Sequence, residues 1–483
     1  MKRFSRLYII GFLWTSLSLS AQENILTSRV LREPVQKVSE VNDANSVTTI
    51  EYYDTAGRLI QTIRKGFGPN GEDLADYIQF DEAGRIAKEY LSTPFTGNNG
   101  VFVPVSEFEQ STQTWSRTHL YEASTEGRIV ETSGMHVGGK SIKYDYRLSN
   151  SSEPELSALE FRMQNNTTIN KRMAARGAYQ VVEEIDEDGH RILLFTDSDG
   201  HTVLKRRADG DVYHDTYMVY DAYDHLRCVL PPAAVDAYSS FDDQSLSAGN
   251  FLDLYAYFYI YDNDNQCVGV KYPGADWIYT VYDGDYRPIL SQDGNQRKRD
   301  EWSFIKYDGL GRVVIEGIVK DKRTRDDLAD IYEDVLVHEE YIGTEGPCRG
   351  YTDHIKMGQN RYILTCIRYY DNYAFTEFSS DWSFANMASS ASAKGLLTGV
   401  FEAVLNQPDK GRFTINQYDD KSRLIRRDSK ETLSNNTLSA DYSYNFSGAL
   451  TRSDSRYGNR YSLRLDYNYD HAGREKNSIC VLG

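Results

Sequence analysis

The sequence predicts a mainly β protein, built as an antiparallel array of β-hairpin repeats with one or two short helices. Three observations lead to this fold class: a short turn-forming phrase recurs, its copies are regularly spaced, and the composition suits paired strands. The chain of 483 residues holds 37 Tyr against 19 Phe and only 11 Pro. Tyrosine suits half-buried sheets, whereas proline cannot donate to a sheet ladder.

The clearest copy of the phrase is Tyr-Asp-Gly-Leu-Gly-Arg-Val-Val at residues 307–314. Strand-forming residues precede and follow it, while Asp308 and Gly311 occupy the first and fourth positions of a β-turn. An Asp at the first position accepts bonds from backbone N–H groups further along the turn, and a Gly at the fourth position adopts φ > 0. The phrase therefore predicts a hairpin with a type I turn and a following bulge, flanked by Tyr307 and Arg312.

The same phrase recurs along the chain. Asp224 and Asn265 replace the turn glycine and tolerate φ > 0, whereas Tyr286 and Ser422 fit that position poorly, so we expect altered turns there. Neighbouring copies in the clearest stretches start 21 to 27 residues apart, which is typical of a repeat array whose units bury their apolar faces against each other. Close copies start at Tyr53, Phe80 and Tyr469, and looser ones at Ile185, Thr196, Tyr220, Tyr261, Tyr282, Tyr418 and Tyr444.

This phrase resembles the YD repeat of RHS and teneurin-like proteins. The chain is also similar to the N-terminal region of Bacteroidetes RHS-repeat proteins in an ordered set of segments, at residues 67–74, 121–128, 229–232, 272–277, 291–297 and 394–399. The resemblance implies an open or partial RHS-type β-spiral shell that encloses or presents a C-terminal effector cargo. The family's core domain carries self-cleaving aspartates beside Asp-Pro-type motifs. This sequence has no Asp-Pro dipeptide, so we expect it to lack that core and the toxin-like cargo.

The N-terminus predicts export. Lys2, Arg3 and Arg6 precede an apolar stretch at residues 7–19, and small residues offer cleavage after Ala21. A signal peptide at residues 1–21 would make the protein secreted or part of the cell envelope; an uncleaved membrane anchor is the alternative. No other apolar run is long enough for a stable membrane span. The net charge of −17 argues against nucleic acid as a partner.

We divide the rest of the chain into an N-terminal β region at 22–150, a repeat array ending in a helix at 151–345, and further repeats at 346–483. Thr324 and Asp327 predict a capped helix over 324–337, and a short helix is expected at 233–238. Residues 101–111 read as a strand and 130–140 as a loop. The apolar residues 479–483 follow a turn whose return strand looks too short. We therefore expect exposed strand edges that self-associate or bind other parts of a shell.

The sequence identifies no catalytic, cofactor-binding or metal-binding residue. The G-x-G-x-x-G pattern at 66–71 contains a turn signal and precedes a strand, so a dinucleotide site is not predicted. Acidic turns at 186–189, 197–200 and 262–265 lack an EF-hand pattern, and we interpret them as turn chemistry rather than calcium sites. His338-Glu339-Glu340 begins like a zincin helix, but Ile342 replaces the second His. His190 and His201 take the Arg place of the repeat and are interpreted as hairpin side chains.

Two side-chain types leave alternatives open. The five cysteines lack C-x-x-C spacing, which does not support a disulfide framework or a zinc site, although isolated pairing remains open. Trp115, Trp277, Trp302 and Trp382 are core candidates that could instead stack on sugars. The sequence thus predicts a non-enzymatic, secreted RHS/YD-repeat structural protein; the alternative is a surface adhesion or glycan-binding module, and a hydrolase finds little support.

Overall fold

The computed structural model describes residues 24–31, 37–42, 46–68, 70–111, 115–134, 140–163, 169–239, 245–246, 252–354, 356–357, 362–377, 393–405, 407–445, 448–458, 461–469 and 474–483. The predicted signal peptide at 1–21, Trp382 and the turn residues 470–473 lie outside this set. Among the described residues, no helix is long and apolar enough to cross a bilayer.

One antiparallel sheet of 27 strands dominates the fold, as the recurring turns predict. Its first arc holds β1 (Asn24–Leu31), β2 (Ser46–Tyr53), β3 (Leu59–Arg64), β4 (Asp73–Phe80), β5 (Ile86–Phe95), β6 (Ser116–Tyr121), β7 (Ile129–Ser133) and β8 (Ser141–Leu148). Each strand pairs with the next, and β8 then pairs with β11 (Gln180–Ile185). The pairing of β7 with β6 and β8 corrects the predicted loop at 130–140 for residues 130–133, while residues 135–139 lie outside the described set.

The second arc continues with β12 (Arg191–Thr196), β13 (Thr202–Asp209), β14 (Val212–Tyr220), β15 (Leu226–Leu230), β17 (Tyr257–Tyr261), β18 (Cys267–Lys271), β19 (Ile278–Tyr282) and β20 (Pro288–Gln292). The third arc holds β21 (Glu301–Tyr307), β22 (Val313–Lys320), β23 (Ile363–Asp371), β24 (Ala393–Val404), β25 (Gln407–Tyr418), β26 (Leu424–Glu431), β27 (Thr437–Tyr444), β28 (Leu450–Tyr457), β29 (Tyr461–Tyr469) and β30 (Glu475–Leu482). β30 pairs with β29 over its length, which corrects the expectation of a short return strand.

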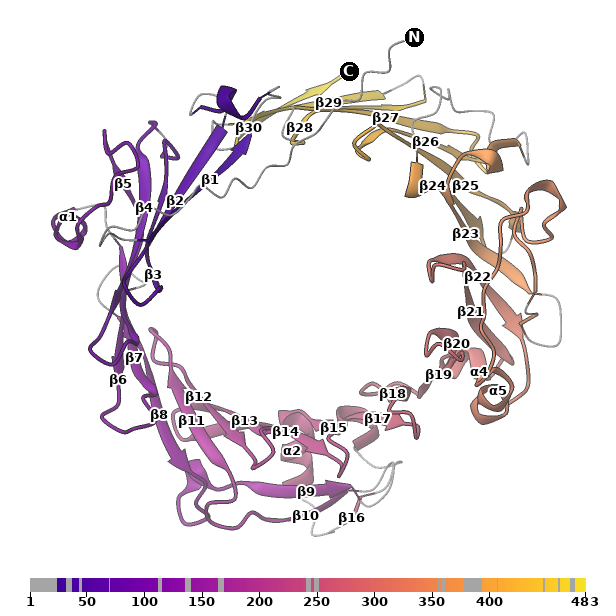
Figure 1. The fold of residues 1–483 in the computed structure, drawn as a ribbon. Helices are drawn as coiled ribbons and strands as arrows, with labels where there is room; N and C mark the ends of the chain where they lie inside the picture. The colour runs from indigo at the N-terminus through magenta and orange to yellow at the C-terminus, as the bar shows by residue number, and fades with distance from the viewer. Residues whose placement is uncertain are drawn as a thin grey trace.

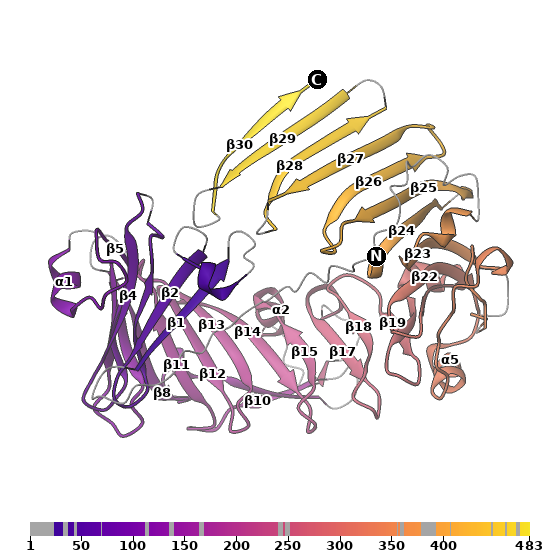
Figure 2. The same cartoon turned by 45° about the horizontal axis from the view of Figure 1, so that its top comes forward.

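The sheet curls into a spiral that surrounds an open centre (Figure 1). In the turned view, β28 to β30 rise above β1 and β2 rather than meeting them in the same plane (Figure 2). The two ends touch through a side chain: Arg474 donates to the carbonyl of Phe67 at 3.0 Å, and its guanidinium lies 5.2 Å from the Phe67 ring centre. Among the described residues, β1 pairs only with β2 and β30 only with β29.

Short elements form an outer layer on the spiral. They are α1 (Val105–Gln110), α2 (Pro232–Ser239), α3 (Leu252–Tyr255), α4 (Gly294–Arg297), α5 (Arg325–Tyr332), the 3-10 turns η1 (Val38–Glu40), η2 (Pro154–Leu156), η3 (Gly343–Glu345) and η4 (Ala374–Glu377), and a small sheet of β9 (Leu159–Met163), β10 (Ile169–Met173) and β16 (Ser245–Leu246). Figure 1 places α1, α5, β9 and β10 outside the ring.

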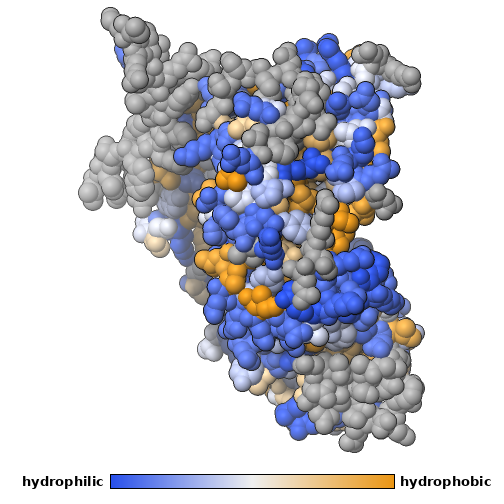
Figure 3. All heavy atoms as spheres, turned by 90° about the vertical axis from the view of Figure 1, so that its right-hand side faces the viewer, coloured by the Kyte–Doolittle hydropathy of each residue, from blue (hydrophilic) through white to orange (hydrophobic). Residues whose placement is uncertain are grey.

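Three hydrophobic cores lie between the sheet and this outer layer. Phe108 of α1 packs on the first arc, Ile169 of β10 packs on the second, and Leu328 of α5 packs on the third with Trp302 and Phe304. Because strand side chains alternate, the remaining residues of each strand point toward the open centre. We call these two surfaces the outer and inner faces. The exterior near α5 is mostly hydrophilic, with small hydrophobic patches (Figure 3).

The helix predictions are confirmed in part. Thr324 and Asp327 form the predicted capping box at the start of α5, although the helix ends at Tyr332 rather than continuing to residue 337. α2 covers the expected helix at 233–238. The strand predicted at 101–111 is wrong: α1 forms there, because its Phe108 is fully buried in the aromatic core of the first arc.

Candidate functional site

The repeat turn has the geometry that the phrase predicts. In the turn after β21, Asp308 Oδ1 accepts from the backbone N–H groups of Leu310 and Arg312, both at 2.9 Å. Gly311 donates its N–H to the Asp308 carbonyl at 2.9 Å and has φ +77°. The β21–β22 register shifts between Lys306, which faces Ile315, and Tyr307, which faces Val313. The β22 strand therefore bulges by one residue just after the turn. The Asp side chain thus completes the turn from within, as a type I turn with a bulge requires.

The Arg and Tyr of the phrase connect each turn to the next. Arg312 Nε donates to Asp308 Oδ2 at 2.6 Å, and its guanidinium lies over the ring of Tyr370 at 4.4 Å. The Tyr370 hydroxyl donates to the carbonyl of Val313, the residue after that Arg, at 3.2 Å. The same Arg-over-ring contact joins Arg58 to Phe80, Arg85 to Tyr121, Arg128 to Tyr146, Arg287 to Tyr307 and Arg423 to Tyr444. The phrase therefore holds neighbouring hairpins in register.

The expectation of altered turns at Tyr286 and Ser422 is wrong. Tyr286 and Ser422 were expected to alter their turns, yet both adopt the left-handed conformation, with φ +58° and +62°. Their N–H groups donate to Asp283 and Asp419 carbonyls at 2.9 and 3.1 Å. The Asp side chain and the paired strands stabilise the turn, so the residue at its fourth position is kept at positive φ despite the strain. Asp224 and Asn265 adopt φ +67° and +64°, as predicted.

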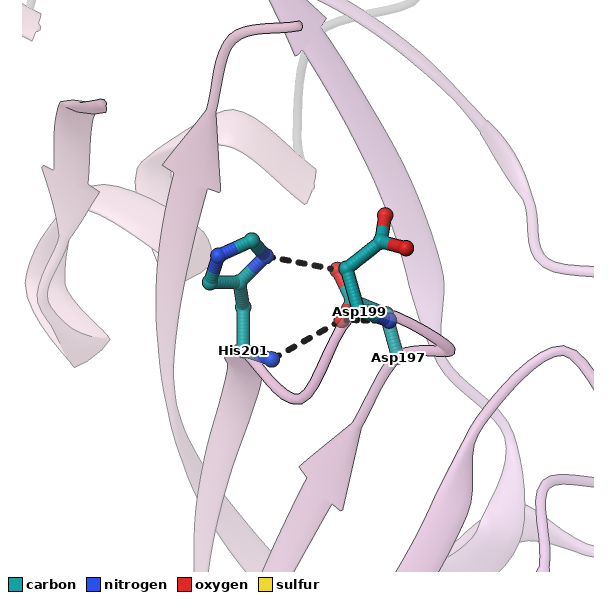
Figure 4. Close-up of side chains that lie close together, drawn as sticks. All are labelled: Asp197, Asp199 and His201. Atoms are coloured by element: carbon teal, nitrogen blue, oxygen red, sulfur yellow. Dashed lines mark hydrogen bonds and ion pairs between the residues drawn. The ribbon is translucent and has the colours of Figure 1, made fainter. Parts of the chain in front are cut away.

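The acidic turn at 197–200 includes the strongest metal candidate among the described residues (Figure 4). One ligand atom each from Asp197, Asp199 and His201 lies within 4.8 Å of the others. The turn itself uses the Asp197 carboxylate, which accepts from the N–H groups of Asp199 and His201 at 3.0 and 2.9 Å. The His201 ring stacks on Tyr220 at 4.4 Å, as an Arg does elsewhere. This geometry is that of a repeat turn.

Other candidate residues are also placed by the structure. His190 Nδ1 lies 2.8 Å from Asp186 Oδ2, and this bond lowers the pKa of the Asp186 carboxyl. In the third acidic turn, Asp262 accepts from two backbone N–H groups in the same way. The glycine-rich segment at 66–71 leads into strand β4. His338 and Glu339 lie outside any helix, and Glu339 is fully buried beside Lys306.

The tryptophans and cysteines of the described residues differ in how far they are buried. Trp302 is buried in the core of the third arc, and Trp277 stacks on Tyr279 with ring centres 6.2 Å apart. Trp115 is half exposed, at 50%. All five cysteines are unpaired, and only Cys480 is exposed.

The inner and outer faces exchange character along the last strands. On β27 to β29 the outer face carries ion pairs, Arg464 to Asp454 at 2.7 Å and Arg452 to Asp466 at 2.6 Å. The register places these residues on the face of Ile415, which belongs to the outer core. The inner face carries apolar and aromatic side chains instead, with exposed fractions of 39% for Leu438, 43% for Tyr457, 68% for Tyr461 and 81% for Leu482. We call these four residues the inner apolar patch.

On other strands the inner face carries ion pairs. Arg64 pairs with Asp76 at 2.7 Å, Arg117 with Glu89 at 3.2 Å, and Arg368 with Glu316 at 2.9 Å. The inner surface thus carries ion pairs on several strands, and its apolar side chains include the inner apolar patch on β27 to β30 and Val30 and Leu148 elsewhere. Neither the lumen pattern nor the contacts between turns could be found from the phrase alone.

Comparisons with known proteins place the fold. A family model described as a domain of unknown function, DUF6443, matches residues 27–147. No curated protein sequence matches the chain significantly. A crystal structure of TcdB2-TccC3-Cdc42 is similar with a TM-score of 0.50 and 13% identity, over 94% of this chain and 20% of that chain. A crystal structure of TcdB2-TccC3 without its hypervariable C-terminal region gives 0.50 and 13%, over 90% and 19%.

This likeness concerns the fold alone. It agrees with the RHS-type β-spiral that the repeat phrase implies, and this chain spans about a fifth of the length of those chains. In fold, the chain resembles the RHS shell of the Tc toxin TcdB2-TccC3.

Proposed function

We propose that this protein is a non-enzymatic wall segment of a secreted β-shell, and that the shell encloses or presents a polypeptide cargo. The observation that carries the proposal is the inner apolar patch. A lone antiparallel sheet exposed to water would be expected to show little contiguous apolar surface, because such patches mark interaction sites. On β27 to β29 the ion pairs face outward and the inner apolar patch faces the enclosed space, whereas on β30 Ile479 and Val481 are exposed on the outer face, at 53% and 51%.

An unfolded polypeptide fits such a surface. It offers apolar side chains to Leu438 and Leu482 and backbone polar groups to the hydroxyls of Tyr457 and Tyr461, because tyrosine combines an apolar ring with a polar tip. The ion pairs on other strands of the inner face would stay wetted and hold the chain less tightly. The hypervariable C-terminal region named for TcdB2-TccC3 suggests where a cargo would be attached in a longer assembly of this fold.

We propose further parts of the shell as partners. Among the described residues β1 and β30 are edge strands with one partner strand each, and Val30 and Leu482 on them are 69% and 81% exposed. Open edges favour pairing with another strand. Light scattering on the purified chain at micromolar concentration should show self-association, and a monodisperse, protease-resistant monomer would contradict it. Export is tested by reversing the charges of Lys2, Arg3 and Arg6, which should retain the protein in the cell.

The cargo proposal can be tested with two adjacent positions of β29. A photo-crosslinking residue at Leu465 points to the inner face, and one at Arg464 points to the outer face, since Arg464 opposes Asp454 in the register. In the producing cell, the inner probe should crosslink to one defined polypeptide and the outer probe should not. Equal products from both positions, or none from Leu465, would contradict enclosure.

A further inference from the structure

Lys306 is a charged residue at a core position. It follows Trp302 and Phe304 on the outer face of β21, and its side chain is 0% exposed. Its Nζ donates to Glu339 Oε1 at 2.6 Å and to Asp353 Oδ1 at 2.7 Å. The Glu339 side chain is also 0% exposed, and that of Asp353 is 16% exposed. One amine and two carboxyl groups thus meet at a site that is closed to solvent around Lys306 and Glu339 and partly open at Asp353.

Neighbouring groups hold both carboxyl groups in position. Glu339 Oε2 accepts from the Thr352 hydroxyl at 2.6 Å and from the His354 N–H at 2.9 Å. Burial raises the pKa of Tyr362, and its bonds to Cys348 and Asp353 raise it further. The Tyr362 hydroxyl therefore stays protonated and donates to Asp353. Both carboxyl groups thus have hydrogen-bond partners other than Lys306.

This cluster is not a one-to-one ion pair, because a single amine contacts two carboxyl groups. The Lys306 nitrogen lies 2.7 Å from Asp353 Oδ1, so a nucleophile is held beside its electrophile with the high effective concentration that fixed geometry gives.

We propose that Lys306 and Asp353 form an intramolecular isopeptide bond, with Glu339 as the general acid–base. The Lys306 ammonium gives one proton to Glu339, and the amine attacks the carboxyl carbon of Asp353. Glu339 passes that proton to a departing Asp353 oxygen. The nitrogen then loses its second proton to the same oxygen through Glu339, the carbon–oxygen bond breaks, and one water leaves. The products are a neutral amide, an ionised Glu339 and water, so the total charge is unchanged.

The two carboxyl groups have different roles because their surroundings differ. Asp353 is the partly exposed one, so water released from it has a way out. Glu339 is enclosed and has its second oxygen held by Thr352 and His354, which suits a group that carries protons and remains in place. The bond would join β21 covalently to the outer-layer segment that contains Asp353.

Mass spectrometry of the intact, denatured protein tests the proposal. The chain should be lighter by the mass of one water than its sequence requires, with its N-terminus assigned from the same sample. Trypsin should then leave residues 300–312 uncut after Lys306 and joined to residues 350–356, which contain Asp353. Glu339 falls in the separate peptide 326–349, because Arg349 provides a cleavage site between the two acids.

Variants and a chemical control complete the test. Lys306→Arg and Asp353→Ala should each restore the full mass, and Glu339→Gln should lower the linked fraction while keeping the full-mass form. The link should survive hydroxylamine, which opens a cyclic imide formed at Asp-Gly steps. A wild-type chain of full mass with a linear peptide 350–356 would overturn the proposal, whether or not the variants fold. A water loss mapped to another peptide would overturn it equally.

Discussion

Replacing Gly311 by valine should destabilise the protein through its backbone alone. Gly311 has φ +77°, and a Cβ built on it would meet no other atom within 4 Å. Crowding by the rest of the molecule therefore contributes nothing. The cost arises within the residue, because a β-branched side chain at positive φ collides with its own backbone.

The size of the effect follows from that conformation. A non-glycine residue held in a sparsely populated region costs about 1–3 kcal/mol, and valine should fall in the upper half of this range. Gly309 provides a matched control in the same turn: it also has open space around its Cβ position, but its φ is not positive. Gly309→Ala should change the free energy of unfolding by less than about 1 kcal/mol. Gly311→Asn should cost less than Gly311→Val, because asparagine tolerates this conformation.

Urea unfolding measures the loss, and hydrogen exchange of the peptide that spans residues 300–312 locates it. Gly311→Val should lower the urea midpoint of unfolding. It should also speed hydrogen exchange more at this hairpin than at distant ones, since each repeat unit contacts only its neighbours. Equal losses for Gly309→Ala and Gly311→Val would refute the turn assignment. So would an unchanged midpoint for Gly311→Val.

Four further outcomes follow from the contacts. Ser422→Gly should raise the urea midpoint, because relief of about 1–3 kcal/mol of strain exceeds the roughly 0.5–1 kcal/mol entropy cost of glycine; a lower midpoint would contradict it. Arg312→Lys should cost about 1–3 kcal/mol in thermal unfolding, because lysine cannot reach both Asp308 and Asp371 while stacking on a ring. Thr324→Ala should cost about 1 kcal/mol and speed amide exchange in α5, and unchanged exchange would oppose the capping box. The pKa of Glu122 is lowered from 4.5 to about 2, first by its bond from Arg128; its contribution to stability is therefore complete above pH 4.5 and lost as pH falls toward 2, and Glu122→Gln should reduce this acid sensitivity.

The turns could be predicted because their determinants are local. Asp308 and Gly311 lie within one turn, and the bonds that define it run between residues two to four apart. The prediction failed at Tyr286 and Ser422 for a physical reason. Propensity ranks residues in isolation, whereas the Asp283 and Asp419 side chains and the paired strands impose the conformation on whatever residue is present.

The outer layer could not be predicted in the same way. Residues 101–111 show no clear period, and α1 forms because Phe108 packs on Tyr77, Tyr90 and Phe95 of the first arc, with ring centres 4.9 to 5.6 Å apart. Such packing depends on distant segments. The alternation of Trp302, Phe304 and Lys306 along one strand was a usable signal for a buried lysine. Its partners lie 33 and 47 residues away, which the sequence does not reveal.

The Arg-over-ring contacts between neighbouring hairpins could be predicted only in part. The phrase places an Arg beside each turn and a Tyr before the next, so their recurrence was visible. Their contact was not, because the stacking of Arg312 on Tyr370 spans a long insertion between β22 and β23. The reversal of the inner and outer faces at β27 to β29 was also hidden, because it depends on which face the outer layer covers.

Cryo-electron microscopy of the assembly purified from its producing cell tests the central claim most directly. We expect the β-spiral in a larger wall, with additional polypeptide density against the inner apolar patch of Leu438, Tyr457, Tyr461 and Leu482, and none against the ion pairs of Arg452 and Arg464. Density that covers the outer face of β27 to β29 while solvent fills the inner side would contradict the account.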